Sequence, residues 1–239
     1  MGHLLNDRQI IKAIMKKFAA IYQRALERKG GEKALNALLS KTAKSATELA
    51  APEDEHYLDA MSKAIFKAGF VWKIVDYKWA VFEQAFWNFN VTRCAWMSPD
   101  DIDQLLSDSR IIKHHKKILA VQSNAAMLLD IQQSHGSFGR FIADWPAADF
   151  VGLLNYLHKH GSRLGPRTCQ YFLRHVGKQG FIIGTDGAAA LIDAGVIDGY
   201  PSSNKDMQKV QSAYNEWQQQ SGLNLNQLSQ VLALSIDVG

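Results

Sequence analysis

Apolar residues recur every three or four positions along nearly the whole chain, and this spacing constrains the fold more than any other feature. Near the N-terminus the pattern runs through Ile10, Ile14, Phe18 and Ile21. Side chains at this spacing lie on one face of an α-helix, so each such run predicts an amphipathic helix. The strand-like run at 181–183 is too short to build a sheet. We therefore predict an all-α fold.

Two segments contain strong helix-start signals. Pro52-Glu53-Asp54-Glu55 places a proline at a position that needs no amide, and acids at the positive end of the helix dipole. Ser98-Pro99-Asp100-Asp101 adds a hydroxyl cap to the same arrangement. Each segment predicts the start of a helix.

Residues 149–176 are predicted to form a helical hairpin. Asp149 can cap the first helix, Gly161 and Gly165 flank the turn, and Pro166 begins the second helix. Free amides at such a helix start attract anions, and Lys159, Arg163 and Arg167 surround the turn. The segment therefore predicts a grip on one DNA phosphate. An ordinary helical hairpin, in which a glycine merely ends a helix, is the alternative.

The composition excludes several classes of protein. There are 27 basic and 23 acidic residues, a net charge of +4, which permits a nucleic-acid partner without requiring one. Two cysteines form neither a disulfide framework nor a Cys-x-x-Cys metal motif. The sequence begins without a recognisable signal peptide and contains no apolar run of about 18 residues, so we expect a cytoplasmic protein with no membrane partner.

Three stretches resemble one known family. Residues 66–72, Phe-Lys-Ala-Gly-Phe-Val-Trp, resemble its Gln-Gln-Ala-Gly-Leu-Ser-Trp. Residues 111–118, followed by Asn124-Ala125, resemble its Gly-Ile-Ile-Arg-His-Arg-x-Lys-Ile and Asn-Ala. Residues 164–168 lie where the family has its hairpin. From Tyr57 to about Asp193 the chain is thus similar to the type I 3-methyladenine DNA glycosylases of the helix-hairpin-helix repair superfamily.

The resemblance implies a helix-hairpin-helix DNA glycosylase fold and removal of alkylated purines such as 3-methyladenine from double-stranded DNA. Such an enzyme flips the base out of the stack into a pocket. The resemblance places Trp72 against the flipped base, with Phe66, Lys67 and Tyr57 as further contacts. Because 3-methyladenine is cationic in DNA, an aromatic face would add a cation–π contribution of about 1–2 kcal/mol.

The resemblance also implies contacts with the DNA backbone. Lys113, Lys116 and Lys117 would release counterions from phosphates, although such a run is commonly a solvated helix face. Adjacent His114 and His115 point in different directions on a helix, so we do not expect them to bind a metal. The expected DNA contacts are Gly161, Arg163, Gly165, Arg167, Thr168, Lys113, Lys116 and Lys117.

The chain departs from the family at two places. The family has a glutamate eight residues before its tryptophan, and Ala64 stands there in this chain. Asp59 and Asp76 are possible replacements. The family's zinc ligands are also missing, so we expect neither a metal nor another cofactor. Lys67 replaces a neutral glutamine, and its charge would repel a cationic base unless the side chain points away.

Asp186 is the predicted catalytic residue. Many enzymes of the superfamily place an aspartate after the hairpin to stabilise the cationic sugar, although Asp186 would also serve as a simple helix cap. Lys178 is expected at the surface rather than at a lyase position, so we predict a monofunctional hydrolase and a monomer. Its domains would be a helical extension, 1–50, and a glycosylase domain, 51–239.

Two other functions remain open at this point. Loss of the pocket glutamate at Ala64 would fit a DNA-binding protein that keeps the fold without catalysis. A helical scaffold for protein–protein contacts would explain the helices, but neither the hairpin nor the Trp72 region.

Overall fold

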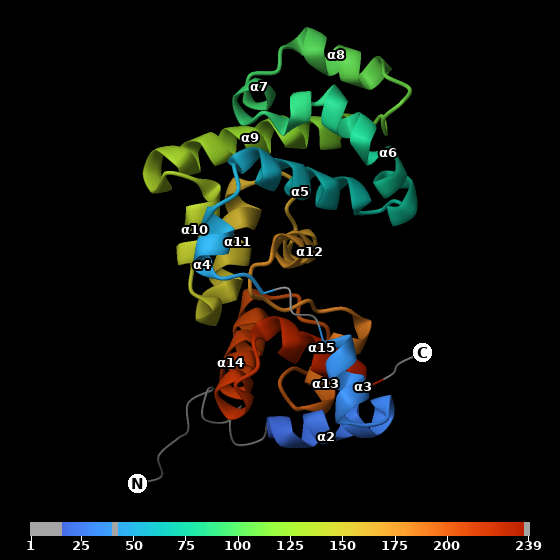
Figure 1. The fold of residues 1–239 in the computed structure, drawn as a ribbon, viewed down its shortest axis with the longest axis vertical. Coiled ribbons are helices and arrows are strands. Elements are labelled where there is room, and N and C mark those ends of the chain that lie inside the picture. Colours follow the sequence, from blue (N-terminus) through green and yellow to red (C-terminus); the bar gives the residue numbers. More distant parts are fainter. Residues whose placement is uncertain (1–15, 40–42, 237–239) are drawn as a thin grey trace. The chain divides into compact units, whose positions relative to one another are not determined.

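The computed structural model describes residues 16–39 and 43–236 of the chain. Over these ranges every regular element is a helix (Figure 1). The predicted all-α fold is therefore confirmed. The apolar stripe that we predict from Ile10 and Ile14 begins outside the described residues, and α2 is described from Phe18.

The described chain divides into two compact units. The terminal unit consists of the described residues before 44, together with 147–151 and 179–236. The central unit consists of 44–146 and 152–178. This division into compact units differs from the boundary that we predict at residue 50. Our assignment of residues 51–239 to a glycosylase domain stays a prediction.

The terminal unit has its own aromatic core. The rings of Phe181 and Tyr214 stack with centroids 4.4 Å apart, and Trp217 packs edge-on against Tyr214. Helix α15 packs against both α2 and α13. The elements of this unit are α2 (Phe18–Lys29), α3 (Glu32–Leu38), η2 (Ala147–Asp149), α13 (Thr185–Asp193), α14 (Asn204–Ser221) and α15 (Leu225–Ser235).

The central unit contains the predicted hairpin. Helix α5 lies against both α9 and α12 (Figure 1). The elements are α4 (Ala46–Ala50), α5 (Asp54–Lys67), α6 (Trp72–Ala85), η1 (Trp87–Phe89), α7 (Val91–Ala95), α8 (Pro99–Ser107), α9 (His115–His135), α10 (Phe138–Asp144), α11 (Phe150–His160) and α12 (Pro166–Val176).

A column of aromatic rings fixes α6 against α5. The rings of Trp79 and Phe82 stack 4.9 Å apart, and Phe82 meets Phe66 of α5 at 4.7 Å. Both phenylalanines are completely buried. Burying a phenylalanine side chain stabilises a fold by about 1.5–3 kcal/mol, so this column holds the second half of α6 firmly beside α5.

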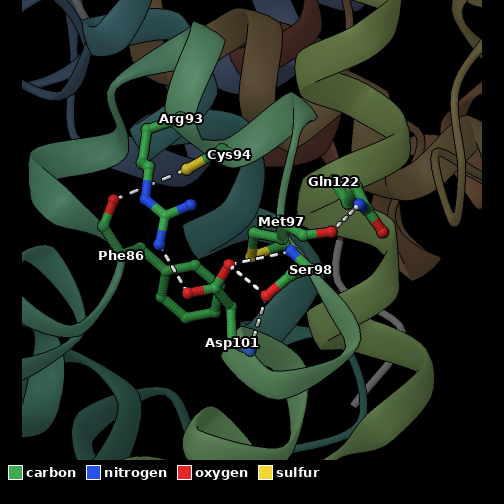
Figure 2. A network of polar contacts seen from close by, with 7 residues as sticks. All are labelled: Phe86, Arg93, Cys94, Met97, Ser98, Asp101 and Gln122. Carbon is green, nitrogen blue, oxygen red and sulfur yellow. Dashed lines mark hydrogen bonds and ion pairs between the residues drawn. The ribbon is translucent and has the colours of Figure 1, made fainter.

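A polar network at the start of α8 ties neighbouring helices together (Figure 2). Ser98 and Asp101 form a reciprocal capping box, which confirms the predicted helix start. Arg93 of α7 pairs with Asp101 at 2.5 Å, and Gln122 of α9 donates to the carbonyl of Met97 at 2.8 Å. The hydrogen bonds from Ser98 hold the pKa of Asp101 below its usual value.

Candidate functional site

A cavity of about 580 Å³ lies in the central unit. Its walls come from α5, from α12 and from the loop that joins α5 to α6. The lining residues are Ala60, Lys63, Ala64, Lys67, Ala68, Gly69, Phe70, Trp72, Arg167, Thr168, Tyr171, Arg174 and His175. This volume lies within the range typical of sites for small organic groups.

Helix α5 lines the cavity with two small residues and two cations. Ala60, Lys63, Ala64 and Lys67 recur at helical spacing, so they share one face. Ala64 therefore faces the cavity, at the position where the family has its glutamate. Among the described residues that line the cavity, none is acidic.

Helix α12 supplies the opposite wall. Arg167, Tyr171 and Arg174 follow one another at i, i+4 and i+7, and Thr168 and His175 flank this stripe. Burial lowers the pKa of His175, and the nearby charge of Lys63 lowers it further. Both effects favour the neutral form of the imidazole.

The α5–α6 loop is fixed by a buried lysine. Lys117 of α9 donates to the carbonyl of Phe66 at 3.1 Å and to that of Ala68 at 2.6 Å. These carbonyls lie at the C-terminal end of α5. A cation is stabilising there because the helix dipole is negative at that end. Gly69, at φ 77°, then turns the chain toward Trp72.

Lys117 does not fit our prediction that it contacts a DNA phosphate. Only 3% of the residue is exposed, and its ammonium is held by backbone carbonyls. Burial lowers its pKa to about 8. Lys113 and Lys116 of the same run are exposed, and their contact with DNA stays a proposal. Helix α9 begins at His115, so Lys113 precedes it.

Trp72 forms part of the cavity wall and remains 48% exposed. The edge of its ring meets Tyr171 of α12, with centroids 5.1 Å apart and planes at 88°. The Lys67 ammonium lies over the Trp72 ring, 5.3 Å from its centroid. The predicted pocket tryptophan and the unexpected lysine of the same motif therefore lie together.

Neither predicted replacement acid lines the cavity. Asp76 of α6 accepts both Lys63 at 3.2 Å and Lys67 at 2.9 Å, and these partners lower its pKa. Asp59 accepts the Trp79 indole N–H at 2.6 Å, and burial raises its pKa. Asp76 offsets part of the positive charge of Lys63 and Lys67. Asp59 instead satisfies the indole N–H of Trp79 in the aromatic core.

The hairpin turn is held from outside by one side chain. Asn124 of α9 accepts the amide of Ser162 at 2.7 Å and donates to its carbonyl at 3.1 Å. A Cβ on Gly161 would lie 2.8 Å from the Leu157 carbonyl oxygen, so only glycine fits there. The left-handed residue of the turn is Arg163, at φ 58°.

This geometry changes the expected roles of the two glycines. Gly161 is required for close packing, whereas Gly165 has φ −64° and open space around its Cβ position. The segment Gly165-Pro166 forms the N-cap and first position of α12, as predicted. The amides of Arg167 and Thr168 follow in the first turn, which is the part of a helix that binds anions.

Two residues that we expect at the base lie in the core. Tyr57 is 1% exposed and its hydroxyl donates to the Leu49 carbonyl, while Phe66 is completely buried. The structure brings neither side chain to the cavity. Both residues belong to α5, which forms one wall of the cavity, but their side chains pack in the core.

Two further predicted positions differ from expectation. Asp186 lies in the first turn of α13, in the terminal unit, where Gly184 rather than Asp186 is the N-cap. Lys178, which we expect at the surface, is 5% exposed and donates to the Trp145 carbonyl at 2.5 Å.

The cavity residues that the sequence reasoning missed share one signal. Lys63 on α5, and Tyr171, Arg174 and His175 on α12, continue the helical spacing of the residues that we did select. Extending the α5 face by one turn and the α12 face by two turns would have found them.

The part of the chain that the structure describes offers no group of three or more His, Cys, Asp or Glu side chains able to hold a metal. Cys94 and Cys169 are both buried and free. Likewise, no described helix is long and apolar enough to cross a membrane.

Known proteins resemble this chain in sequence and in fold. Residues 46–160 match the family described as methyladenine glycosylase. DNA-3-methyladenine glycosylase 1 of Escherichia coli (strain K12) is 32% identical over 76 residues. These residues are 32% of this chain and 41% of that relative, so the match spans about two fifths of the relative's length.

Solved structures give the wider likeness. The 8-oxoguanine DNA glycosylase of Methanocaldococcus jannaschii superimposes with a TM-score of 0.56 over 89% of this chain and 91% of that one, at 14% identity. The 3-methyladenine DNA glycosylase I of Staphylococcus aureus gives 0.47 over 52% and 77%, at 26% identity. The first of these confirms the predicted helical DNA glycosylase fold. The two sequence matches lead to one conclusion: residues 46–160 of the chain are similar to the methyladenine glycosylase family.

Proposed function

We propose that this protein is a DNA glycosylase that hydrolyses the N-glycosidic bond of alkylated purines in double-stranded DNA. One observation supports this above the others. The cavity with Trp72 in its wall is built on α12, the helix that begins at the hairpin. The proposed phosphate site and a cavity large enough for a base would thus lie on one helix, and an enzyme that flips bases needs such a pocket.

The hairpin would hold the DNA without reading its sequence. Gly165 leaves open space at the start of α12, where the first amides of a helix lack intrahelical acceptors. Arg163 and Arg167 add positive charge beside these amides. Such a site suits one phosphate of the backbone.

The cavity would hold the extruded base against Trp72. Base–aromatic stacking contributes about 1–3 kcal/mol, and it requires an exposed ring such as that of Trp72. The Thr168 hydroxyl and the His175 imidazole would offer hydrogen bonds to a base edge.

The reaction breaks the bond from the base nitrogen to C1′ of deoxyribose and forms a bond from C1′ to a water oxygen. The base nitrogen takes the bonding electrons. The proton that the water loses passes to the departing base when that base is neutral, or to solvent when the base departs from a cationic form. The products are a free purine and an abasic site. Asp186 remains our proposal for the carboxylate that stabilises the cationic sugar, and a hydrolase without lyase activity remains the proposed type. We also propose that it works as a monomer in the cytoplasm without a cofactor.

A DNA-binding protein without catalysis is the second candidate. It is favoured by Ala64, which puts a methyl group on the cavity wall where the family has a carboxylate. Incubation with methylated DNA and chromatography of the supernatant separates the two functions. Released alkylated purines support the glycosylase, and tight DNA binding with no release supports the alternative.

A further inference from the structure

We propose that the cavity selects neutral modified purines and rejects cationic ones. This inference rests on the proposed function and names the substrate class of the same site. It departs from the expectation of a cationic 3-methyladenine substrate, and three features of the cavity support it.

The first feature is the charge of the lining. Four lining residues carry basic side chains: Lys63, Lys67, Arg167 and Arg174. None of the described residues in the lining is acidic. Two like charges in a partly enclosed site repel strongly because little water screens them. A cationic base would therefore enter against an unfavourable potential.

The second feature is the incomplete compensation of that charge. One carboxylate, Asp76, pairs with both Lys63 and Lys67, and it lies on the exposed side of α6 rather than in the lining. Within the described chain, no carboxylate forms an ion pair with Arg167. Lys63, Lys67 and Arg167 thus outnumber Asp76, the one carboxylate that pairs with two of them.

The third feature is the state of Trp72. An indole face attracts cations, and in this cavity the Lys67 ammonium already lies over that ring at 5.3 Å. The chain thus supplies its own cation to the ring. A cationic base on the same ring would gain less cation–π energy, and the Lys67 ammonium nearby would repel it.

The same groups suit a neutral base whose edge is rich in acceptors. Lysine and arginine donate hydrogen bonds and cannot accept them. Ring nitrogens and exocyclic oxygens of a neutral purine accept such bonds, whereas methylation of a ring nitrogen removes an acceptor and adds charge. Ala60 and Ala64 leave room on the α5 wall for an alkyl group.

Equilibrium dialysis with two isomeric purines tests the inference without requiring catalysis. The probes are 3,9-dimethyladenine, which is protonated and therefore a cation at pH 7, and its isomer N6,9-dimethyladenine, which is neutral. We expect the wild-type protein to bind the neutral isomer at least about tenfold more tightly. Equal or tighter binding of the cation would overturn the inference, and so would failure of both isomers to bind at millimolar concentration.

Two variants and one control sharpen this experiment. Ala64→Glu adds a carboxylate to the lining and should shift the preference toward the cation by about tenfold or more. Lys67→Gln removes one cation and should shift it in the same direction by a smaller factor. Lys73→Gln removes an exposed lysine outside the lining and should leave the ratio unchanged. An unchanged ratio in both cavity variants would contradict the inference.

Alkylated DNA separates this inference from the proposed function. Methylnitrosourea produces both cationic ring-methylated purines and neutral O-methylated guanine. Release of the cationic bases in preference to the neutral one would refute the inference and leave the proposed function intact. Selective binding of the neutral isomer without release of any base would leave the inference intact and refute the proposed function.

Discussion

The ammonium of Lys67 lies 5.3 Å from the centroid of the Trp72 indole ring, on the wall of the cavity. Both residues belong to the short motif by which the sequence resembles its family. The tryptophan matches that motif, whereas the lysine departs from it. The residue that departs from the family thus acts directly on the residue that would stack against a base.

Trp72→Ala should lower the rate of base release by about 10- to 100-fold, because a stacking surface for the base is lost. The melting temperature should change little, since Trp72 is 48% exposed. Trp79→Ala is the matched control: Trp79 is 4% exposed, and its truncation should cost about 3–5 kcal/mol of stability. Trp72 would belong to the core if its variant melted as early as the control while the folded fraction worked normally.

Gly165→Val should weaken binding to damaged and undamaged DNA alike, because a side chain would cover the start of α12. The protein should fold normally, since Gly165 has φ −64° and no atom within 4 Å of its Cβ position. Gly161→Ala should instead destabilise the protein by about 1–3 kcal/mol through overpacking. Fluorescence anisotropy with undamaged duplex measures the first effect. Unchanged affinity in folded Gly165→Val protein would remove the phosphate site from the hairpin.

The three lysines of the 113–117 run should separate into two classes. Lys113→Gln and Lys116→Gln should each reduce the slope of log affinity against log salt concentration by about 0.9, if each contacts one phosphate. Lys117→Met should leave that slope unchanged, because its ammonium is buried against backbone carbonyls. It should cost about 1–3 kcal/mol of stability instead. A reduced salt slope in Lys117→Met would contradict this assignment.

Lys117 also predicts a pH dependence of stability. Burial lowers its pKa from the ordinary value of 10.5 to about 8 in the folded protein. Between these values the unfolded chain binds more protons, so the Lys117 contribution to the free energy of unfolding should rise with pH.

Comparing wild-type and Lys117→Met protein isolates this contribution. The buried thiols of Cys94 and Cys169 have pKa values raised to about 12, and they act in the opposite direction over the same range. Urea denaturation at pH 8 and pH 10 should therefore show a smaller rise, or a larger fall, in the variant than in the wild type. Identical pH profiles would show that Lys117 does not titrate in this range.

The fold was largely predictable because its signals are local. The caps at Ser98 and Gly165-Pro166 depend on neighbouring residues alone, and both are present in the structure. The burial of Lys117 and its contacts were not predictable from neighbouring residues. Its partners, Phe66 and Ala68, lie about fifty positions away, and only tertiary packing brings them together.

The candidate site was predictable only in part. The family motif correctly brought Trp72, Lys67 and Ala64 to the cavity wall. It also suggested Tyr57 and Phe66, whose burial depends on the aromatic packing of α5. The cationic stripe of α12 could have been read from helical spacing, but its position opposite α5 required the structure.

The most direct test of the account is a count of products from methylnitrosourea-treated duplex DNA. The wild-type protein should release free alkylated purines and leave one abasic site for each base, with the strands intact. Trp72→Ala at equal concentration should produce both products about 10- to 100-fold more slowly. Strand breaks equal in number to the released bases would show a lyase instead of a hydrolase. Tight binding to this DNA with neither free bases nor abasic sites would contradict the proposed glycosylase activity itself.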